Sequence, residues 1–370
     1  MTPRTTRKIT IGPLEMGGNA PIVVQSMAAV KTTLVPDVVA TVNRLSEAGA
    51  ALVRLAVDTH QDVLALAEIR AKTAVPLSVD LQENFRLAEE VAPYVDKIRY
   101  NPGHLYHNEP NLPWQKKVAW LVQVAVDFNC ALRIGVNCGS LDPEHAGDDD
   151  PMLQSALEHA DFLESLGFTR FCVSLKSSDP AKVLDLNRTF ARQRPAIPLH
   201  LGVTEAGAPP WGIIKSRMAL EPLLAEGIGD TLRVSLTVEN DRKAEEVLAG
   251  LQLIQRVEQG DVLDPASVRL PKLNIVSCPS CARVENSRFV QLAEQVRAAT
   301  EFASDYPLKI AVMGCRVNGP GETDDADFGL WCGPNAVHLK EGSQSRGTWP
   351  YDEVIAQLLE LLRVRGIKQS

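Results

Sequence analysis

Short runs of β-branched and other apolar residues alternate with longer helical patterns through most of the chain. In the segment 37–48, for example, Val38, Val42 and Leu45 recur at helical spacing. Strands that alternate with helices of this length indicate a parallel sheet. The strand-like runs are 22–25, 52–56, 77–81, 96–99, 131–136, 170–175, 198–202 and 231–236.

Eight strands and their helices fit the (β/α)8 barrel in number and in size. The alternative is an open, doubly wound sheet, which usually has a glycine-rich turn after its first strand. Gln25-Ser26-Met27 follows the first run here and is not such a turn. We therefore predict an α/β fold with a TIM barrel over residues 1–262. The helical patterns lie at 37–48, 61–72, 114–127, 152–166, 180–192, 215–226 and 242–254.

Polar side chains gather at the carboxyl ends of these predicted strands. Because those ends meet at one rim of a barrel, where the chemistry of such folds takes place, we expect the side chains to converge. They are Gln25, Arg54, Asp80, Arg99, Asn101, Arg133, Asn137, Ser174, Lys176, His200, Glu205, Arg233 and Ser235.

Five of these strand-end residues are cations: Arg54, Arg99, Arg133, Lys176 and Arg233. Crowded like charges repel each other unless an anion joins them. Arginine binds phosphate oxygens in a bidentate fork. The rim therefore predicts a multiply phosphorylated small molecule as ligand. The alternative is that Asp80, Glu205 and other carboxylates neutralise the cations internally.

The sequence pattern changes after residue 254. Gln259-Gly260-Asp261 and Asp264-Pro265 are typical of a linker. A second unit follows, with a helix expected over about 284–302, a strand over 309–313 and a last helix over about 351–363. We predict a small α/β domain over residues 263–370.

This second unit contains Cys278-x-x-Cys281, a spacing found in redox dithiols, zinc sites and iron–sulfur sites. Cys315 follows its own strand and opens a turn rich in Gly and Pro, but it lacks the second CxxC pair of a zinc ribbon. Three thiolates with Glu322 as a weaker ligand would suit a cluster that keeps one iron reactive. Iron–sulfur is therefore favoured over zinc, although Cys332 keeps a zinc site open.

Charge and cysteine usage narrow the class of protein further. A net charge of −8 argues against a general nucleic-acid binder. No apolar run approaches ~18 residues, so we expect no membrane span. No secretory signal is visible at residues 1–8, so a cytoplasmic, thiol-reduced setting is expected. We expect Cys130, Cys138 and Cys172, in or beside barrel strands, to be buried apolar filler.

Several motifs occur in one order along the chain, and together they resemble the 4-hydroxy-3-methylbut-2-enyl diphosphate synthases of the non-mevalonate isoprenoid pathway. The resemblance extends from about residue 7 to 351 and fits the bacterial two-domain form. The motifs are Val24-Gln25-Ser26-Met27, Lys97-Ile98-Arg99-Tyr100-Asn101-Pro102-Gly103, Arg133-Ile134-Gly135-Val136-Asn137, His200-Leu201-Gly202-Val203-Thr204-Glu205-Ala206-Gly207, Gly227-Ile228-Gly229-Asp230-Thr231-Leu232-Arg233-Val234-Ser235, Cys278-x-x-Cys281 and Gly314-Cys315-x-Val317-Asn318-Gly319-Pro320-Gly321-Glu322.

The resemblance implies that the barrel binds 2-C-methyl-D-erythritol 2,4-cyclodiphosphate and that the second domain carries a [4Fe-4S] cluster. It implies a two-electron reductive ring opening with loss of water, in which flavodoxin or ferredoxin supplies the electrons. It also implies a homodimer in which the cluster domain of one subunit caps the barrel of the other. The implied cluster ligands are Cys278, Cys281, Cys315 and Glu322, with substrate contacts at Arg54, Arg99, Arg133, Lys176, Arg233 and Ser235, and further pocket positions at Asp80, Asn137, Glu205 and Asn318.

The chain departs from the family pattern on one side of the barrel mouth. Ala28-Ala29-Val30 stands where the family usually has Thr-Asn-Thr, and Leu81-Gln82-Glu83 stands where it has Ile-His-Phe. We expect His104 and His107 to lie on a solvated loop rather than to replace the missing histidine.

Two other functions remain open from the sequence. One is a zinc-stabilised barrel enzyme that acts on a phosphorylated metabolite without redox chemistry and uses Cys332 as a ligand. The other is a non-enzymatic sensor of redox state or iron, which the two departures motivate.

Overall fold

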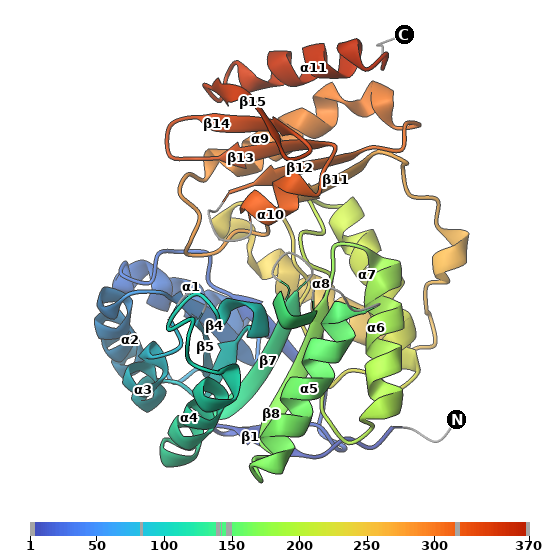
Figure 1. The fold of residues 1–370 in the computed structure, drawn as a ribbon. Helices are drawn as coiled ribbons and strands as arrows, with labels where there is room; N and C mark the ends of the chain where they lie inside the picture. The colour runs from blue at the N-terminus through green and yellow to red at the C-terminus, as the bar shows by residue number, and fades with distance from the viewer. Residues whose placement is uncertain are drawn as a thin grey trace.

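The computed structural model describes residues 4–81, 84–137, 141, 143–145, 150–314 and 319–367. Its N-terminal part is an eight-stranded parallel sheet in the order β8-β7-β6-β5-β4-β3-β10-β9 (Figure 1). A parallel bridge between Val173 and Leu199 joins β8 to β9 and closes the sheet into a barrel. The strands are β3 (Val23–Met27), β4 (Leu52–Val57), β5 (Leu77–Leu81), β6 (Lys97–Tyr100), β7 (Ala131–Asn137), β8 (Phe171–Lys176), β9 (His200–Leu201) and β10 (Thr231–Leu232).

Helices surround this barrel, and several begin where the sequence provides a cap. The Thr59 side chain and Asp62 form a capping box at the start of α2, and Asp179 caps α6 ahead of a proline. The helices are α1 (Val35–Glu47), α2 (His60–Lys72), α3 (Leu87–Val91), α4 (Trp114–Asp127), α5 (Pro151–Ser165), α6 (Pro180–Gln193), α7 (Trp211–Ala225) and α8 (Ala244–Glu258). Short 3-10 turns lie at η1 (Ala92–Tyr94), η2 (Pro102–His104), η3 (Pro143–His145), η4 (Asn240–Arg242), η5 (Pro265–Ser267) and η6 (Glu301–Ala303).

The predicted (β/α)8 barrel is confirmed, and each predicted strand overlaps an observed one. Two features were not predicted from the sequence. One is α3, which is only five residues long. The other is an antiparallel hairpin of β1 (Ile9–Ile11) and β2 (Leu14–Met16), whose turn contains Gly12 at φ +54°. Its apolar side chains pack against Val23 and Leu52, so the hairpin closes the amino end of the barrel.

Successive side chains of a barrel strand point alternately outwards to the apolar core under the helices and inwards to the polar interior of the barrel. On β4, Val53 and Leu55 join the large apolar core, whereas Leu52 joins the small cluster at the hairpin and Arg54 lines a pocket. The interior below that pocket is polar as well, since Lys97 donates to the side-chain oxygen of Gln25 over 2.9 Å. Burial lowers the pKa of Lys97 to about 8.

The second domain is a five-stranded sheet in the order β11-β12-β13-β14-β15. The first three strands are parallel and the last two antiparallel to their neighbours. The helices α9 and α11 contact each other, and Figure 1 shows α10 on the sheet face towards the barrel. The elements are β11 (Asn274–Ser277), α9 (Arg288–Ala299), β12 (Lys309–Met313), α10 (Gly319–Asp324), β13 (Phe328–Cys332), β14 (Val337–Glu341), β15 (Gln344–Trp349) and α11 (Val354–Val364).

This small α/β domain was predicted, but the three strands β13 to β15 were not. The segment between α8 and β11 connects the two parts, and the predicted division after residue 262 falls within it. The second domain lies over the carboxyl end of the barrel (Figure 1). None of the described helices has the length and apolar character needed to cross a bilayer.

Candidate functional site

A cavity of about 70 Å³ lies between the barrel rim and residues 278–283, which we call the cysteine loop. Of the strand-end residues that were expected to converge, nine line it, whereas Gln25, Asn101, Ser174 and His200 do not. The nine are Arg54, Asp80, Arg99, Arg133, Asn137, Lys176, Glu205, Arg233 and Ser235, with Cys278 and Cys281 on the loop. The lining also includes residues that were not predicted: Met27, Thr204, Pro279, Ser280 and Arg283.

Two of the five rim cations are paired with buried carboxylates. Arg99 donates to Asp80 over 2.7 Å, and Arg233 lies 3.2 Å from the carboxylate of Glu246. The internal neutralisation that we considered from the sequence is therefore real, but it is partial.

The other three cations, Arg54, Arg133 and Lys176, form no ion pair with a carboxylate of the described residues. Instead, Arg133 donates to the hydroxyl of Ser174 over 3.0 Å, and Arg54 lies 3.0 Å from the sulfur of Met27. The pocket therefore holds positive charge that the described carboxylates leave uncompensated.

This excess charge shifts the pKa values of the pocket residues. Burial, followed by repulsion from Arg133, holds the pKa of Lys176 well below its ordinary value. Burial and repulsion from neighbouring arginines, despite attraction to Asp80, lower the pKa of Arg54 to about 10. Burial alone would raise the pKa of Asp80, but Arg99, Arg54 and Arg283 outweigh it and hold that pKa well below its usual range. An anion with several negative charges would relieve the repulsion.

Glu205 and Asn137 occupy distinct positions in this pocket. Glu205 is buried, follows β9 and has φ +46°, a left-handed conformation that is uncommon for residues other than glycine. Its carbonyl accepts a hydrogen bond of 3.4 Å from the amide of Ser277, which links the two domains. The Asn137 amide, oriented to satisfy both of its groups, accepts from Arg99 over 3.2 Å.

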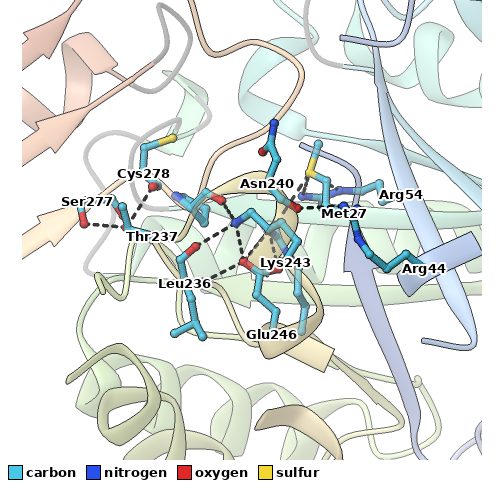
Figure 2. A network of polar contacts seen from close by, with 12 residues as sticks. Met27, Arg44, Arg54, Leu236, Thr237, Asn240, Lys243, Glu246, Ser277 and Cys278 are labelled. Atoms are coloured by element: carbon cyan, nitrogen blue, oxygen red, sulfur yellow. Dashed lines mark hydrogen bonds and ion pairs between the residues drawn. The ribbon is translucent and has the colours of Figure 1, made fainter. Parts of the chain in front are cut away.

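A buried network holds the cysteine loop from the barrel side (Figure 2). Lys243 donates to the carbonyl of Leu236 and to Glu246, each over 2.9 Å, and also to the carbonyl of Pro279. Since Glu246 also pairs with Arg233, one carboxylate serves both a rim cation and the lysine under the loop. Sequence reasoning missed Lys243 and Glu246 because both lie in a segment with an ordinary helical pattern.

Arg283 holds the same loop from its other end. Its guanidinium forms two hydrogen bonds of 2.6 Å to Asp58 and one of 3.0 Å to the carbonyl of Asp80. The only sequence signal was a charged residue two positions after Cys281.

The start of the cysteine loop lies beside the end of β12. The Cys278 amide donates to the carbonyl of Val312 over 3.2 Å, and the Glu285 amide donates to the carbonyl of Gly314 over 3.2 Å. Cys315 and Asn318 lie outside the described residues. Glu322 is on α10, and its side chain is likewise outside them.

Cys278 and Cys281 line the pocket together, and such thiolates fit both an iron–sulfur cluster and a zinc ion. Among the described residues, which include Cys332, no three potential ligands come together. Cys332 is instead buried in the core of the second domain, where burial raises its pKa to about 12.

The predictions for the other cysteines are confirmed where they can be compared, but the prediction for the histidines is partly wrong. Cys130 and Cys172 are fully buried, as predicted, and Cys138 lies outside the described residues. The expectation of a solvated loop is wrong for His104, although His107 is exposed. The turn η2 buries His104, and this burial, with repulsion from Arg99, lowers its pKa to about 3.

The resemblance implies that a partner subunit covers the barrel, and this stays a prediction because the structure describes one chain. In this single chain the cysteine loop lies on the chain's own barrel, where the amide of Ser277 and the carbonyl of Glu205 meet.

Comparison with known proteins bears on both domains. A family model described as the GcpE TIM-barrel domain matches residues 6–251, and the GcpE protein C-terminal domain matches residues 274–364. A protein of Rhodopirellula baltica is 56% identical over 363 residues, covering 96% of this chain and 95% of its own. One of Symbiobacterium thermophilum is 37% identical, covering 98% and 94%. Both relatives are named 4-hydroxy-3-methylbut-2-en-1-yl diphosphate synthase (flavodoxin).

Among solved structures, dihydropteroate synthase from Stenotrophomonas maltophilia matches with a TM-score of 0.50 and 12% identity. The match covers 69% of this chain and 98% of that one. At this level of identity the likeness concerns the fold alone.

Proposed function

Because this chain belongs to the GcpE family, whose two domain models match it in order, we propose that it is a 4-hydroxy-3-methylbut-2-enyl diphosphate synthase. Its substrate is then 2-C-methyl-D-erythritol 2,4-cyclodiphosphate. The reaction takes up two electrons and two protons, opens the ring at a carbon–oxygen bond and releases water. The observation that carries the proposal is the pocket in which strand-end cations face the cysteine loop.

The rim cations bind the two phosphates in this proposal. Arg54, Arg133 and Lys176 have no carboxylate partner among the described residues, so their charge is available to phosphate oxygens. Arg99 is held by Asp80 and by the carbonyl of Gly135, which fixes the direction of its guanidinium. Fixed cations orient the ring and stabilise negative charge that develops on the phosphate that leaves carbon.

We assign cluster binding to Cys278, Cys281, Cys315 and Glu322. A [4Fe-4S] cluster held by these residues would supply the electrons and a Lewis-acidic iron. The loop carrying Cys278 and Cys281 covers the pocket, which excludes water from the reacting carbon. We assign proton delivery to the carboxyl of Glu205, which lines the pocket, and give Asn318 a supporting role.

We further propose flavodoxin or ferredoxin as electron donor, a homodimer and a cytoplasmic setting. The donor is supported by the word flavodoxin in the relatives' names. The dimer rests on the resemblance of the motifs. The setting is supported by the described cysteines, none of which forms a disulfide.

Conversion of the cyclic diphosphate by the anaerobically purified, cluster-loaded protein with reduced flavodoxin tests the function. We expect the protein to form product, and we expect Glu322→Ala to abolish it. Glu360→Ala, on the exposed face of α11, is the control and should leave product formation unchanged. A colourless, zinc-loaded protein that leaves the substrate intact would instead support the barrel enzyme without redox chemistry.

Mixing a Cys278→Ser subunit with an Arg133→Met subunit tests the dimer. Restored activity is expected if caps are exchanged between subunits. Failure of the mixture, together with a monomeric mass in solution, would overturn the homodimer.

A further inference from the structure

Arg283 lies where the cysteine loop meets the barrel, and neither the motifs nor the family resemblance gave it a role. Its side chain is buried, lines the pocket and lies between two carboxylates that belong to the barrel. We propose that Arg283 is a positioning residue that couples anion binding at the rim to docking of the cysteine loop. This inference rests on the proposed function for the identity of the anion, but not for the contacts themselves.

The first contact is a geometric anchor. The two hydrogen bonds of 2.6 Å from Arg283 to Asp58 use both oxygens of the carboxylate, which is the fork geometry that only arginine provides. Asp58 follows β4 and does not line the pocket. Asp58 thus fixes where the loop lies without touching substrate.

The second contact connects the loop to a phosphate-binding arginine. One oxygen of Asp80 accepts from Arg99 over 2.7 Å, and the other lies 3.5 Å from Arg283. Asp80 is therefore shared between the rim and the loop. An anion that binds Arg99 competes with Asp80 for the guanidinium, so the Asp80 carboxylate can move closer to Arg283.

Charge repulsion explains why anion binding should favour docking of the loop rather than oppose it. Docking of the loop adds the Arg283 guanidinium to a pocket that already holds Arg54, and the two repel each other. An anion between them removes that cost. Anion binding therefore favours docking and, by linkage, docking favours anion binding to the same extent.

The volume of the capped cavity adds an independent reason for loop movement. About 70 Å³ is well below the ~300–1,000 Å³ of typical ligand pockets. A diphosphate therefore needs the loop or the neighbouring side chains to move before it fits, and after a loop movement Arg283 must find Asp58 and Asp80 again.

The test combines three variants with one control. Asp58→Asn removes the anchor outside the pocket, Arg283→Gln removes the fork, and the double variant asks whether the two act as one unit. Arg188→Gln breaks another bidentate pair, that with Glu226, on the outer helices. Arg283→Lys keeps the charge without the fork.

Two measurements are made on each variant. The first is hydrogen–deuterium exchange of residues 277–287 with and without inorganic pyrophosphate, in protein without the cluster. The second is kcat and KM of the loaded enzyme, with iron content as the measure of assembly.

We expect pyrophosphate to slow exchange of this segment in the wild type and in Arg188→Gln, and to lose that effect in Asp58→Asn and Arg283→Gln. In those two variants kcat should fall by roughly 10- to 100-fold at unchanged iron content, since loss of positioning costs rate. The double variant should be within about twofold of either single variant, and Arg283→Lys should be intermediate.

Three results would each overturn the proposal. The first is an Asp58→Asn variant whose exchange and kcat match the wild type. The others are losses in kcat that multiply in the double variant, and a loss of iron that parallels the loss of kcat. A wild type that shows the protection but makes no product would refute the proposed function and leave the role of Arg283 standing.

Discussion

The hydroxyl of Thr237 lies 3.0 Å from the carbonyl oxygen of Cys278, so a residue just beyond the last barrel strand holds the first cysteine of the motif. The same hydroxyl lies 2.6 Å from that of Ser277. All three residues are buried, so these contacts form away from water. The cysteine motif is therefore positioned by the barrel as well as by its own domain.

Thr237→Val should lower kcat by about tenfold while iron content stays the same. The variant keeps the shape of the side chain but removes the hydroxyl that lies within hydrogen-bond distance of the carbonyls of Ser277 and Cys278, at a cost of about 1–3 kcal/mol to the docked loop. Thr237→Ser, which restores the hydroxyl, should recover most of the activity. Equal activity in the valine and serine variants would show that the hydrogen bond is irrelevant.

Lys176→Met should stabilise the substrate-free protein and abolish substrate binding. Lys176 is buried among cations, and removing an uncompensated buried charge relieves desolvation and repulsion. A gain of about 1 kcal/mol, or roughly 2–4 °C in Tm, is expected. Calorimetry of unfolding and of substrate titration checks both effects, with exposed Lys182→Met as control. A lower Tm for Lys176→Met than for the wild type would contradict the claim that the pocket holds uncompensated positive charge.

The stabilisation by Lys176→Met should depend on pH. The folded protein lowers the pKa of Lys176 below the ordinary value of 10.5, so the charged form is penalised only in the folded state. Below the lowered pKa the penalty is complete, and it disappears as the pH rises through that pKa towards 10.5. The Tm difference between variant and wild type should therefore be largest at low pH and shrink on raising it. A Tm difference that grows with pH would show that folding does not lower the pKa of Lys176.

Cys332→Ala should leave iron and sulfide content unchanged, whereas Cys281→Ser should reduce both strongly. Cys332 is packed in the core of the second domain, and its raised pKa opposes the thiolate that a metal requires. Cys281 lines the pocket. Metal analysis after anaerobic reconstitution distinguishes the two, and iron loss in Cys332→Ala would restore the zinc alternative that uses this residue.

Much of the pocket could be predicted because it follows from strand register. Arg54, Arg99 and Arg133 are each the third residue of a parallel strand, and the register pairs Arg99 with Arg133, so the parallel arrangement brings these positions to one level of the barrel. The spacing of apolar residues, which differs between strands and helices, was enough to predict the barrel.

The partners of these residues could not be predicted in the same way. Glu246 lies 13 positions after Arg233, and Asp58 lies 225 positions before Arg283. These pairs depend on how α8 and the second domain pack, which no local pattern specifies. His104 was misjudged for the same reason, because its burial comes from the turn η2 folding onto the barrel.

The central claim is that the diphosphate binds between the strand-end cations and the cysteine loop. An anaerobic crystal structure of the cluster-loaded enzyme with the cyclic diphosphate tests it most directly. We predict both phosphates on Arg54, Arg99, Arg133 and Lys176, with the ring facing the loop that carries Cys278 and Cys281. Density for the substrate in the larger groove of about 740 Å³ beside Trp211 and Arg297, with none at the rim, would contradict the claim.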